Sequence, residues 1–235
     1  MCGSIDLTRW IPTGSNILDR LLEGGLPPSI NLIYGEAETG KSTLAMQCAL
    51  NCARLGLKTL YVDSDGTFSL ERLFQIASQD LKEVSDLIIL LKPSTFSEQA
   101  EIVDGLERYV NRRFGLIVFD TITSLYRLEI VGRKETFHLN RELNRQVAML
   151  GQIAKSFNLS VLLISQVRSI YWLDRGDIAP VATRVLKFWS DSVLCLHRTE
   201  QRNVIGASLE KKGGKEANIT FKLAIKEDGI HDYIS

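Results

Sequence analysis

The sequence has few cysteines, no long apolar run and no net charge, and each of these absences excludes a class of protein. Four cysteines in 235 residues do not make a disulfide framework in a chain of this size. We interpret Cys2, Cys48, Cys52 and Cys195 as buried small apolar residues in a reducing cytoplasm. No apolar run approaches the roughly 18 residues of a membrane span, and the first residues lack the apolar core of a signal peptide. We therefore expect a cytoplasmic protein that crosses no membrane.

Charge and composition limit the partners and the number of domains. The 28 Lys and Arg residues balance 28 Asp and Glu residues, so any surface for nucleic acid must be a local patch. Hydrophobic residues make up 45% of the chain, which suits one large α/β domain or two small ones. Because we find no low-complexity linker and no internal repeat, we treat residues 1–235 as a single domain.

Strand-like and helix-like stretches alternate along the chain. Apolar strand-like runs cover residues 30–35, 58–65, 87–93, 116–121 and 160–166. Helical spacing covers residues 41–56, 70–79, 97–113 and 137–157. Strand-like runs alone follow, at residues 190–198, 203–211 and 218–225. This order predicts an α/β fold with a mostly parallel sheet, helices on both faces and a more antiparallel C-terminal part.

A glycine-rich loop in the stretch LIYGEAETGKSTL, residues 32–44, has the pattern of a phosphate-binding P-loop. Four residues separate Gly35 from Gly40, Lys41 and Ser42. This stretch lies between a predicted strand and a predicted helix. The glycines let backbone N–H groups point inward around phosphates, and the helix N-terminus adds positive charge. Lys41 would reach the β- and γ-phosphates, and Ser42 would offer its hydroxyl to Mg²⁺. In this context an ordinary turn is the weaker interpretation.

Three polar residues end strand-like runs on the same side of the predicted sheet. Asp120 closes LIVFD, Asp65 closes YVDSD, and Gln166 closes VLLISQ. Open α/β sheets bind ligands at the carboxyl ends of their strands, where Asp120 can hold Mg²⁺ through water. Asp65 and Gln166 are candidates for orienting an attacking water and sensing the γ-phosphate. The alternatives are a strand-end cap for Asp120, a turn-forming Asp before Gly66, and a simple strand-end amide.

Four further stretches resemble RecA-like recombinases, most closely the archaeal RadA group with its short paralogues. They are IPTGSNILDRLLEGGL before the P-loop, YVDSDGTFSLERL after it, LIVFDTITSLYR and VLLISQV. The similarity runs from about Ile11 to Gly229. It implies a RecA-type core, ATP and Mg²⁺ as ligands, single-stranded DNA as a partner, and a role in homologous recombination and DNA repair.

The resemblance also implies roles for individual residues. Asp120 matches the Walker B carboxylate, which holds Mg²⁺ together with Ser42, and Gln166 matches the γ-phosphate sensor. Lys41, Asp65 and Gln166 form the expected catalytic set. Arg72, in SLERL, matches an arginine that lies near the adenine. The other expected nucleotide contacts are Gly35, Glu38, Thr39, Gly40, Lys41, Ser42 and Thr43.

Two departures from the family pattern bear on activity. Full recombinases begin with a helical DNA-binding domain and a linker that carries the polymerisation motif, whereas only residues 1–34 precede the P-loop here. We therefore expect no separate N-terminal DNA-binding domain and no long filament formed by that route, while a homodimer stays open. The family also has Glu at the position of Asp65, and Asp is shorter by one C–C bond, roughly 1.5 Å. Misplacement on that scale can cost on the order of a hundredfold in rate, so we predict ATP binding with weak or slow hydrolysis.

Two segments that follow strands carry the residues expected to meet DNA. Segment 126–140 is mildly basic, and segment 167–189 mixes cations with aromatic side chains. Cations that meet phosphates, beside aromatic rings that stack on bases, are typical of proteins that bind single strands. The alternative is a solvated loop with aromatic side chains tucked into the core. The candidates are Arg127, Arg133, Lys134, Arg168, Tyr171, Trp172 and Arg175.

Three functions follow from these patterns. The first is an ATP-binding accessory protein of recombination that binds single-stranded DNA and the main recombinase. The second is a DNA-dependent ATPase that catalyses strand exchange, and the third is a KaiC-like signalling ATPase, which shares the TGSxxLDxLLxGG opening. The short N-terminal part and Asp65 favour the first, and the mix of Arg and aromatic residues in segment 167–189 disfavours the third.

Overall fold

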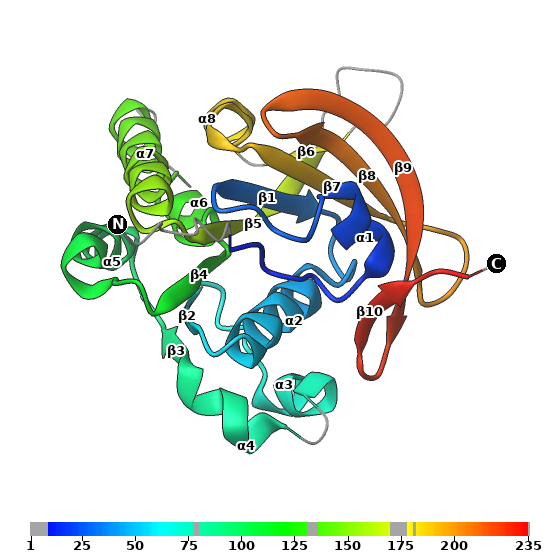
Figure 1. The fold of residues 1–235 in the computed structure, drawn as a ribbon. Coiled ribbons are helices and arrows are strands. Elements are labelled where there is room, and N and C mark those ends of the chain that lie inside the picture. Colours follow the sequence, from blue (N-terminus) through cyan, green and yellow to red (C-terminus); the bar gives the residue numbers. More distant parts are fainter. Residues whose placement is uncertain (1–8, 78–79, 131–135, 170–177, 181, 235) are drawn as a thin grey trace, which may run out of the picture.

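One large sheet organises the fold. The computed structural model describes residues 9–77, 80–130, 136–169, 178–180 and 182–234. The sheet has ten strands in the order β10-β9-β8-β7-β1-β5-β4-β2-β3, and β6 pairs with β5 outside this path (Figure 1). Because strands distant in sequence become neighbours, residues from many parts of the chain meet at its edges.

The half of the sheet that contains the P-loop strand is parallel. β1 pairs in parallel with β5 on one side and with β7 on the other, and β4, β2 and β3 continue the parallel half beyond β5. The strands are β1 (Ile30–Gly35), β2 (Lys58–Asp63), β3 (Ile88–Leu91), β4 (Phe114–Asp120), β5 (Ser160–Ser169) and β7 (Ser192–Arg198).

The C-terminal part of the sheet is antiparallel, as the sequence predicts. β7, β8, β9 and β10 pair in this order through antiparallel ladders, and the short β6 pairs antiparallel with the end of β5. These strands are β6 (Ile178–Pro180), β8 (Val204–Lys212), β9 (Lys215–Lys226) and β10 (Gly229–Asp232).

Helices cover both faces of the sheet. In Figure 1, α2, α3 and α4 lie on one face, and α5, α7 and α8 lie on the other. The helices are α1 (Asn16–Leu21), α2 (Lys41–Arg54), α3 (Leu70–Ala77), α4 (Leu81–Val84), α5 (Phe96–Tyr109), α6 (Ser124–Ile130), α7 (Phe137–Phe157) and α8 (Thr183–Trp189), with a 3₁₀ turn, η1, at Ser85–Leu87. None of the described helices is both long and apolar enough to cross a membrane.

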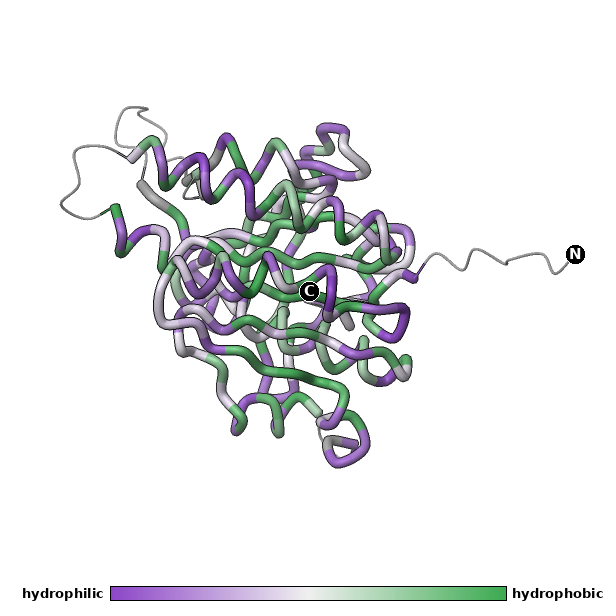
Figure 2. The backbone as a smooth tube through the Cα atoms, turned by 90° about the vertical axis from the view of Figure 1, so that its left-hand side faces the viewer, coloured by the Kyte–Doolittle hydropathy of each residue, from purple (hydrophilic) through white to green (hydrophobic). Residues whose placement is uncertain are grey.

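The core consists of two layers, one on each side of the central strands. β1 is buried along its whole length, and its side chains alternate between the layers. Ile33 joins the layer of Leu50 in α2, whereas Leu32 joins the layer of Leu150 in α7. Figure 2 shows hydrophobic residues following the strands through the middle of the molecule. This double burial holds the carboxyl end of β1 in a fixed position.

The observed elements confirm the predicted fold class, with corrections at strand ends. α7 has the predicted bounds, and its stripe of Leu143, Val147 and Leu150 is buried. β2 ends at Asp63 and not at residue 65. β5 does not stop at residue 166 but continues to Ser169, because its last residues pair with β6.

The cysteines within the described residues are free and buried, as predicted. They are Cys48, Cys52 and Cys195, and Cys2 lies outside the described residues. Burial raises the pKa of Cys52 and of Cys195 to about 11. A thiol with so high a pKa carries little thiolate near neutral pH, which suits an inert core residue.

Candidate nucleotide-binding site

The P-loop connects the end of β1 to the start of α2, as the motif predicts. β1 ends at Gly35 and α2 begins at Lys41, with Gly40 as its N-cap in the left-handed conformation (φ 78°). At Gly35 an added Cβ would lie 2.0 Å from the carbonyl oxygen of Leu196 in the neighbouring strand. Only glycine fits this close approach, and the free N–H groups at the start of a helix such as α2 can bind an anion.

A second strand end holds the P-loop from the side. The Arg198 guanidinium, at the end of β7, donates to the Ala37 carbonyl (3.1 Å) and to the Glu38 carboxylate (2.9 Å). Its backbone N–H donates to the Glu36 carboxylate (2.7 Å). Arg198 was not among the predicted site residues, because nothing near it in the sequence indicates that β7 lies beside β1.

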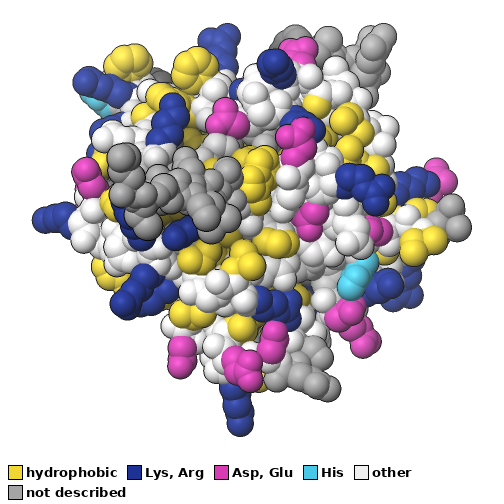
Figure 3. Space-filling model, viewed as in Figure 1, with side chains coloured by type: hydrophobic (Ala, Val, Ile, Leu, Met, Phe, Trp, Pro, Cys, Tyr) yellow, Lys and Arg dark blue, Asp and Glu magenta, His cyan; other side chains and the backbone are white. Residues whose placement is uncertain are grey.

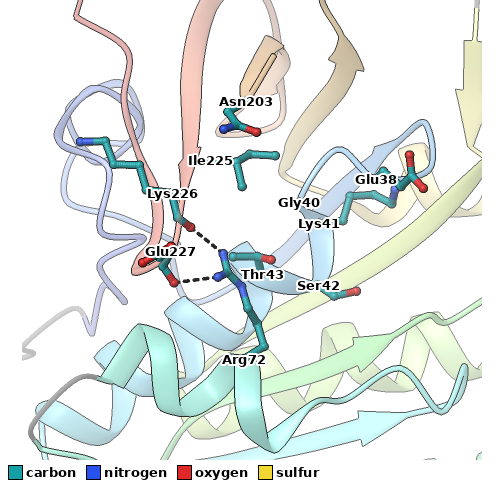
Figure 4. Close-up of a pocket in the computed structure, with 10 residues that line it drawn as sticks. All are labelled: Glu38, Gly40, Lys41, Ser42, Thr43, Arg72, Asn203, Ile225, Lys226 and Glu227. Atoms are coloured by element: carbon teal, nitrogen blue, oxygen red, sulfur yellow. Dashed lines mark hydrogen bonds between the residues drawn. The ribbon is translucent and has the colours of Figure 1, made fainter.

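The pocket beside the P-loop has a volume of about 540 Å³. The C-terminal strands border it on the side opposite the P-loop (Figure 4). One wall consists of the expected residues Glu38, Gly40, Lys41, Ser42 and Thr43. The opposite wall comes from the chain around β9 and was not predicted. That wall contains Asn203, Ile225, Lys226 and Glu227.

Arg72 lies in the same pocket, in α3. Its guanidinium donates to the backbone carbonyls of Glu227 (2.7 Å) and Lys226 (2.9 Å), as the dashed lines in Figure 4 show. Arg72 therefore lies in the same pocket as the P-loop. Its expected position near the adenine of ATP remains a prediction. Thr39 faces inward: it is fully buried, and its hydroxyl donates to the Glu36 carbonyl (2.8 Å).

Lys41 is folded back onto its own loop. Its ammonium donates a hydrogen bond to the Glu36 carbonyl. Burial lowers the pKa of Lys41, and nearby carboxylates, with Asp120 first among them, act in the opposite direction. A phosphate in the loop would supply the negative charge that this partly buried ammonium lacks.

Asp120 offers the clearest sign of a metal site. Its side chain is 1% exposed, and one carboxylate oxygen, Oδ2, accepts a hydrogen bond from the Tyr61 hydroxyl (2.7 Å). The other oxygen, Oδ1, is buried and has no hydrogen-bond partner among the described residues. Burial raises the pKa of Asp120 to about 6, and the hydroxyls of Tyr61 and Ser42 act in the opposite direction. An unpartnered carboxylate oxygen near the Ser42 hydroxyl fits Mg²⁺, which prefers oxygen ligands.

Asp65 and Gln166 meet, although neither residue ends a strand as predicted. The Gln166 amide donates to the Asp65 carboxylate (3.1 Å), and the Arg127 guanidinium donates to the Gln166 carbonyl oxygen. The three residues line a cavity of about 370 Å³. We call this series of contacts the Arg127–Gln166–Asp65 chain.

Asp65 itself does not end a strand, which corrects the prediction. The strand ends at Asp63, which lies in register with Asp120 and accepts hydrogen bonds from the backbone N–H groups of Thr67 (3.0 Å) and Phe68 (3.2 Å). Asp65 lies in the bend that Asp63 stabilises. The peptide bond between Asp120 and Thr121 is cis.

The structure describes only part of the expected DNA surface. Arg127, in α6, is exposed, and Arg168 lies in β5, opposite Ala179 of β6. Basic and acidic side chains both occur across the face drawn in Figure 3, in agreement with the zero net charge. The remaining candidates lie outside the described residues: Arg133, Lys134, Tyr171, Trp172 and Arg175.

Together these features define a class of protein. A P-loop lies at the end of β1, whose two neighbours are β5 and β7, and an acidic residue lies at the end of β4 in the same sheet. This is the arrangement of a P-loop nucleotide-binding core of the RecA type.

Comparisons with known proteins give the family. Residues 7–233 match the Rad51 family. The chain is 33% identical over 227 residues to the "DNA repair and recombination protein RadB" of Methanobrevibacter smithii, covering 94% of each chain. It is 34% identical over 227 residues to the protein of the same name from Thermococcus kodakarensis, covering 94% of this chain and 99% of that one. The chain belongs to the Rad51 family.

A solved structure agrees with this assignment. The crystal structure of the RadB recombinase superimposes with a TM-score of 0.80 at 31% identity, covering 95% of this chain and 100% of that chain. The predicted resemblance to RecA-like recombinases and the predicted fold class are therefore confirmed.

Proposed function

We propose that the chain binds ATP with Mg²⁺ and single-stranded DNA, and that it acts as an accessory protein of homologous recombination and DNA repair with slow ATP hydrolysis. The names of the RadB relatives support the recombination role, and the main recombinase is the expected protein partner. The observation that carries the proposal is the meeting of the P-loop and Asp120 at one edge of the sheet, while Asp65 is already engaged by Gln166.

The proposed nucleotide site uses three kinds of group. The P-loop N–H groups and Lys41 would hold the phosphates, and Arg72 would lie at the base. Ser42 and Asp120 would hold Mg²⁺, directly or through water. When bound, Mg²⁺ would neutralise negative charge on the phosphates.

Slow hydrolysis follows from the position of Asp65. A general base must come within hydrogen-bond reach of its water, and the short Asp65 side chain accepts its hydrogen bond from Gln166 instead. The second contact, from Arg127 to Gln166, holds this arrangement in place. The site is therefore built to hold ATP more readily than to hydrolyse it.

A DNA-dependent ATPase that catalyses strand exchange is the second candidate. The Arg127–Gln166–Asp65 chain favours it, because DNA that attracts Arg127 would release Gln166 and expose the carboxylate of Asp65. The third candidate is a KaiC-like signalling ATPase. The match to the Rad51 family over residues 7–233 disfavours it.

Nucleotide binding is tested with Lys41→Ala. We expect the dissociation constant of a fluorescent ATP analogue to rise by at least about a hundredfold, because the variant loses the charge-assisted contact to the phosphates. Lys82→Ala, which removes an exposed lysine of α4, is the matched control and should bind as the wild type does. Unchanged affinity in Lys41→Ala would contradict the assignment of this site.

The function as a whole is tested by measuring ATP turnover at saturating Mg-ATP, with and without single-stranded DNA, beside a DNA-binding titration on the same samples. Tight DNA binding with turnover near background supports the accessory protein. Turnover that rises several-fold with DNA supports the strand-exchange ATPase. Absence of DNA binding at low salt would contradict both and revive the signalling ATPase.

A further inference from the structure

A large groove is lined by residues of α7 and α8 and lies far from the P-loop; Figure 1 shows where these two helices lie. This α7–α8 groove has a volume of about 850 Å³ and is lined by α7 side chains between Arg145 and Ser156, by residues 28–30, and by residues 188, 189 and 191. The groove reaches Ile30, the first residue of β1, whereas the P-loop begins at Gly35, the last residue of β1. Since β1 has six residues, about 20 Å separates the two sites.

The side of the groove formed by α8 is apolar and exposed. The Phe188 side chain is 74% exposed, and its ring meets that of Trp189 edge-on at 5.3 Å. Trp189 is fixed from the other side, because its indole N–H donates to the Asn144 amide oxygen of α7 (3.0 Å). Aromatic side chains held rigidly at the surface are typical anchors of protein interfaces.

A smaller pocket continues the groove. It has a volume of about 300 Å³ and shares Ser29 and Asp191 with the groove; Trp10, Glu23, Ser192 and Lys212 also line it. We call it the Asp191 pocket. Its backbone is fixed, because the Asp191 N–H donates to the Ile30 carbonyl and the Gly214 N–H donates to the Asp191 carbonyl, both at 2.9 Å.

The Asp191 pocket carries one uncompensated negative charge. Glu23 and Lys212 neutralise each other at 2.7 Å, whereas the Asp191 carboxylate makes no hydrogen bond or ion pair with any described residue. Lys211, in the same strand as Lys212, directs its ammonium at the carbonyls of Ser190 and Lys187. Lys155 lines the groove but not the Asp191 pocket.

The Asp191 carboxylate calls for a ligand that donates hydrogen bonds, because a carboxylate only accepts. The buried hydroxyls of Ser29 and Ser192 have no partner among the described residues, and each can accept a hydrogen bond or donate one. A guanidinium or ammonium group has donors and no acceptor, and its charge complements that of Asp191. Trp10 adds an aromatic wall of the kind that attracts cations.

We propose that the Asp191 pocket and the α7–α8 groove together dock a segment of a partner protein. An Arg or Lys side chain of the segment enters the Asp191 pocket, and an apolar side chain near it packs on Phe188 and Trp189. A protein segment suits this site better than a free small cation, because the exposed aromatic residues adjoin the negative pocket. The inference does not depend on the nucleotide site.

A symmetric peptide tests this site by fluorescence anisotropy. The probe is fluorescein-labelled Gly-Phe-Gly-Arg-Gly-Phe-Gly-amide, which places an apolar residue on either side of Arg. The comparison peptide has the same sequence with neutral citrulline in place of Arg. We expect the wild type to bind the Arg peptide about tenfold more tightly, the scale of one charge-assisted contact. Asp191→Asn should remove this preference, and Phe188→Ser should weaken both peptides alike.

Two variants serve as matched controls. Asp86→Asn removes an exposed carboxylate, and Phe137→Ser removes an exposed aromatic ring (71% exposed) that does not line the groove. Both variants should bind the peptides as the wild type does. All four variants should keep wild-type affinity for an ATP analogue. This readout shows that they are folded and separates this inference from the proposed function.

Four kinds of result would overturn the inference. The first is a wild type that shows no preference for Arg, either because it does not bind the Arg peptide up to about 1 mM or because it binds the citrulline peptide equally well. The second is an unchanged preference in Asp191→Asn. The third is competition by N-acetyl-arginine amide as strong as that of the whole peptide, which would indicate a pocket for a small cation. The fourth is a dimer, detected by light scattering and lost in Phe188→Ser, which would indicate a second copy of the chain as the occupant.

Discussion

The proposed slow hydrolysis depends on the carboxylate of Asp65. It lies next to the place of the γ-phosphate sensor, yet it accepts a hydrogen bond from Gln166, and Gln166 is held by Arg127. A longer side chain at this position would extend past the amide toward the water. The difference between Asp and Glu is a single C–C bond, roughly 1.5 Å, which is large on the scale of catalytic geometry.

Asp65→Glu should therefore raise ATP turnover, by about ten- to a hundredfold. Turnover is measured at saturating Mg-ATP, and the affinity for an ATP analogue is measured on the same samples. Asp86→Glu, at an exposed position, is the control and should have no effect. Unchanged turnover with unchanged affinity would mean that another group limits hydrolysis.

Asp120 links the proposed metal site to the free energy of unfolding. Its pKa in the folded protein, about 6, lies above the ordinary value of 3.8. Between these two values the folded state binds the extra proton, so this group lowers the free energy of unfolding as pH rises from about 4 to about 6. Above pH 6 its full cost, about 3 kcal/mol at most, is present. Mg²⁺ bound at the carboxylate would offset it.

Asp120→Asn should therefore make the nucleotide-free protein more stable than the wild type at pH 7 and remove the stabilisation by Mg-nucleotide. Denaturant unfolding with and without Mg-ATP measures both effects. Asp63→Asn is a contrasting variant at an equally buried position. It should lower stability, because the Asp63 carboxylate accepts two backbone hydrogen bonds and pairs with Lys92 (3.5 Å). Equal effects of the two substitutions would contradict a metal site at Asp120.

At the scale of elements, α2 and β10 are joined by one buried side chain. The Gln47 amide donates to the carbonyls of Thr13 (2.9 Å) and Ile230 (3.0 Å) and accepts from the Ile230 N–H (2.7 Å). Gly14 and Gly229 make room for it, since an added Cβ would lie 2.2 Å or 2.3 Å from the amide. This contact positions the β9–β10 turn, whose chain closes the nucleotide pocket.

Gln47→Ala should lower the free energy of unfolding by about 2–4 kcal/mol, because buried backbone groups lose their partners. It should also weaken binding of an ATP analogue, since the wall around β9 loses its support. Denaturant unfolding and a binding titration measure the two effects. Gln152→Ala, at an exposed position of α7, should change stability by less than about 0.5 kcal/mol. A stable Gln47→Ala variant would contradict this role.

The elements also show where prediction from sequence succeeds. The 21 residues of α7 were predicted with correct bounds, because a long amphipathic stripe is a local signal. The end of β5 was placed at residue 166 although the strand continues to Ser169. Pairing with β6 extends it, and such pairing depends on a segment elsewhere in the chain. The end of β2 was predicted at residue 65 and lies at Asp63. The Asp63 side chain accepts hydrogen bonds that hold the next residues in a bend, and the polar sequence of residues 63–65 does not reveal this.

At the scale of the whole molecule, the Arg127–Gln166–Asp65 chain connects an exposed side chain of α6 with the nucleotide site. Arg127→Ala should weaken binding of single-stranded DNA. For the second candidate function, the DNA-dependent ATPase, it should also bring the ratio of turnover with DNA to turnover without DNA close to one. The reason is that the variant lacks the Arg127 guanidinium, whose hydrogen bond to Gln166 would otherwise be broken by DNA. Arg108→Ala, at an exposed position of α5, is the control. A ratio equal to that of the wild type, with DNA binding weakened, would show that coupling takes another route.

The sequence by itself determined the P-loop, the carboxylate of Asp120 and the alternation of strands and helices. These signals lie within single stretches of chain, where spacing and apolar runs predict local structure directly. Only the tertiary structure decided that β7 and the chain around β9 complete the pocket beside the P-loop, that Arg198 holds the P-loop, and that Asp191 has no partner among the described residues beside the α7–α8 groove. These features join residues from distant strands, and which strands become neighbours depends on packing of the whole sheet.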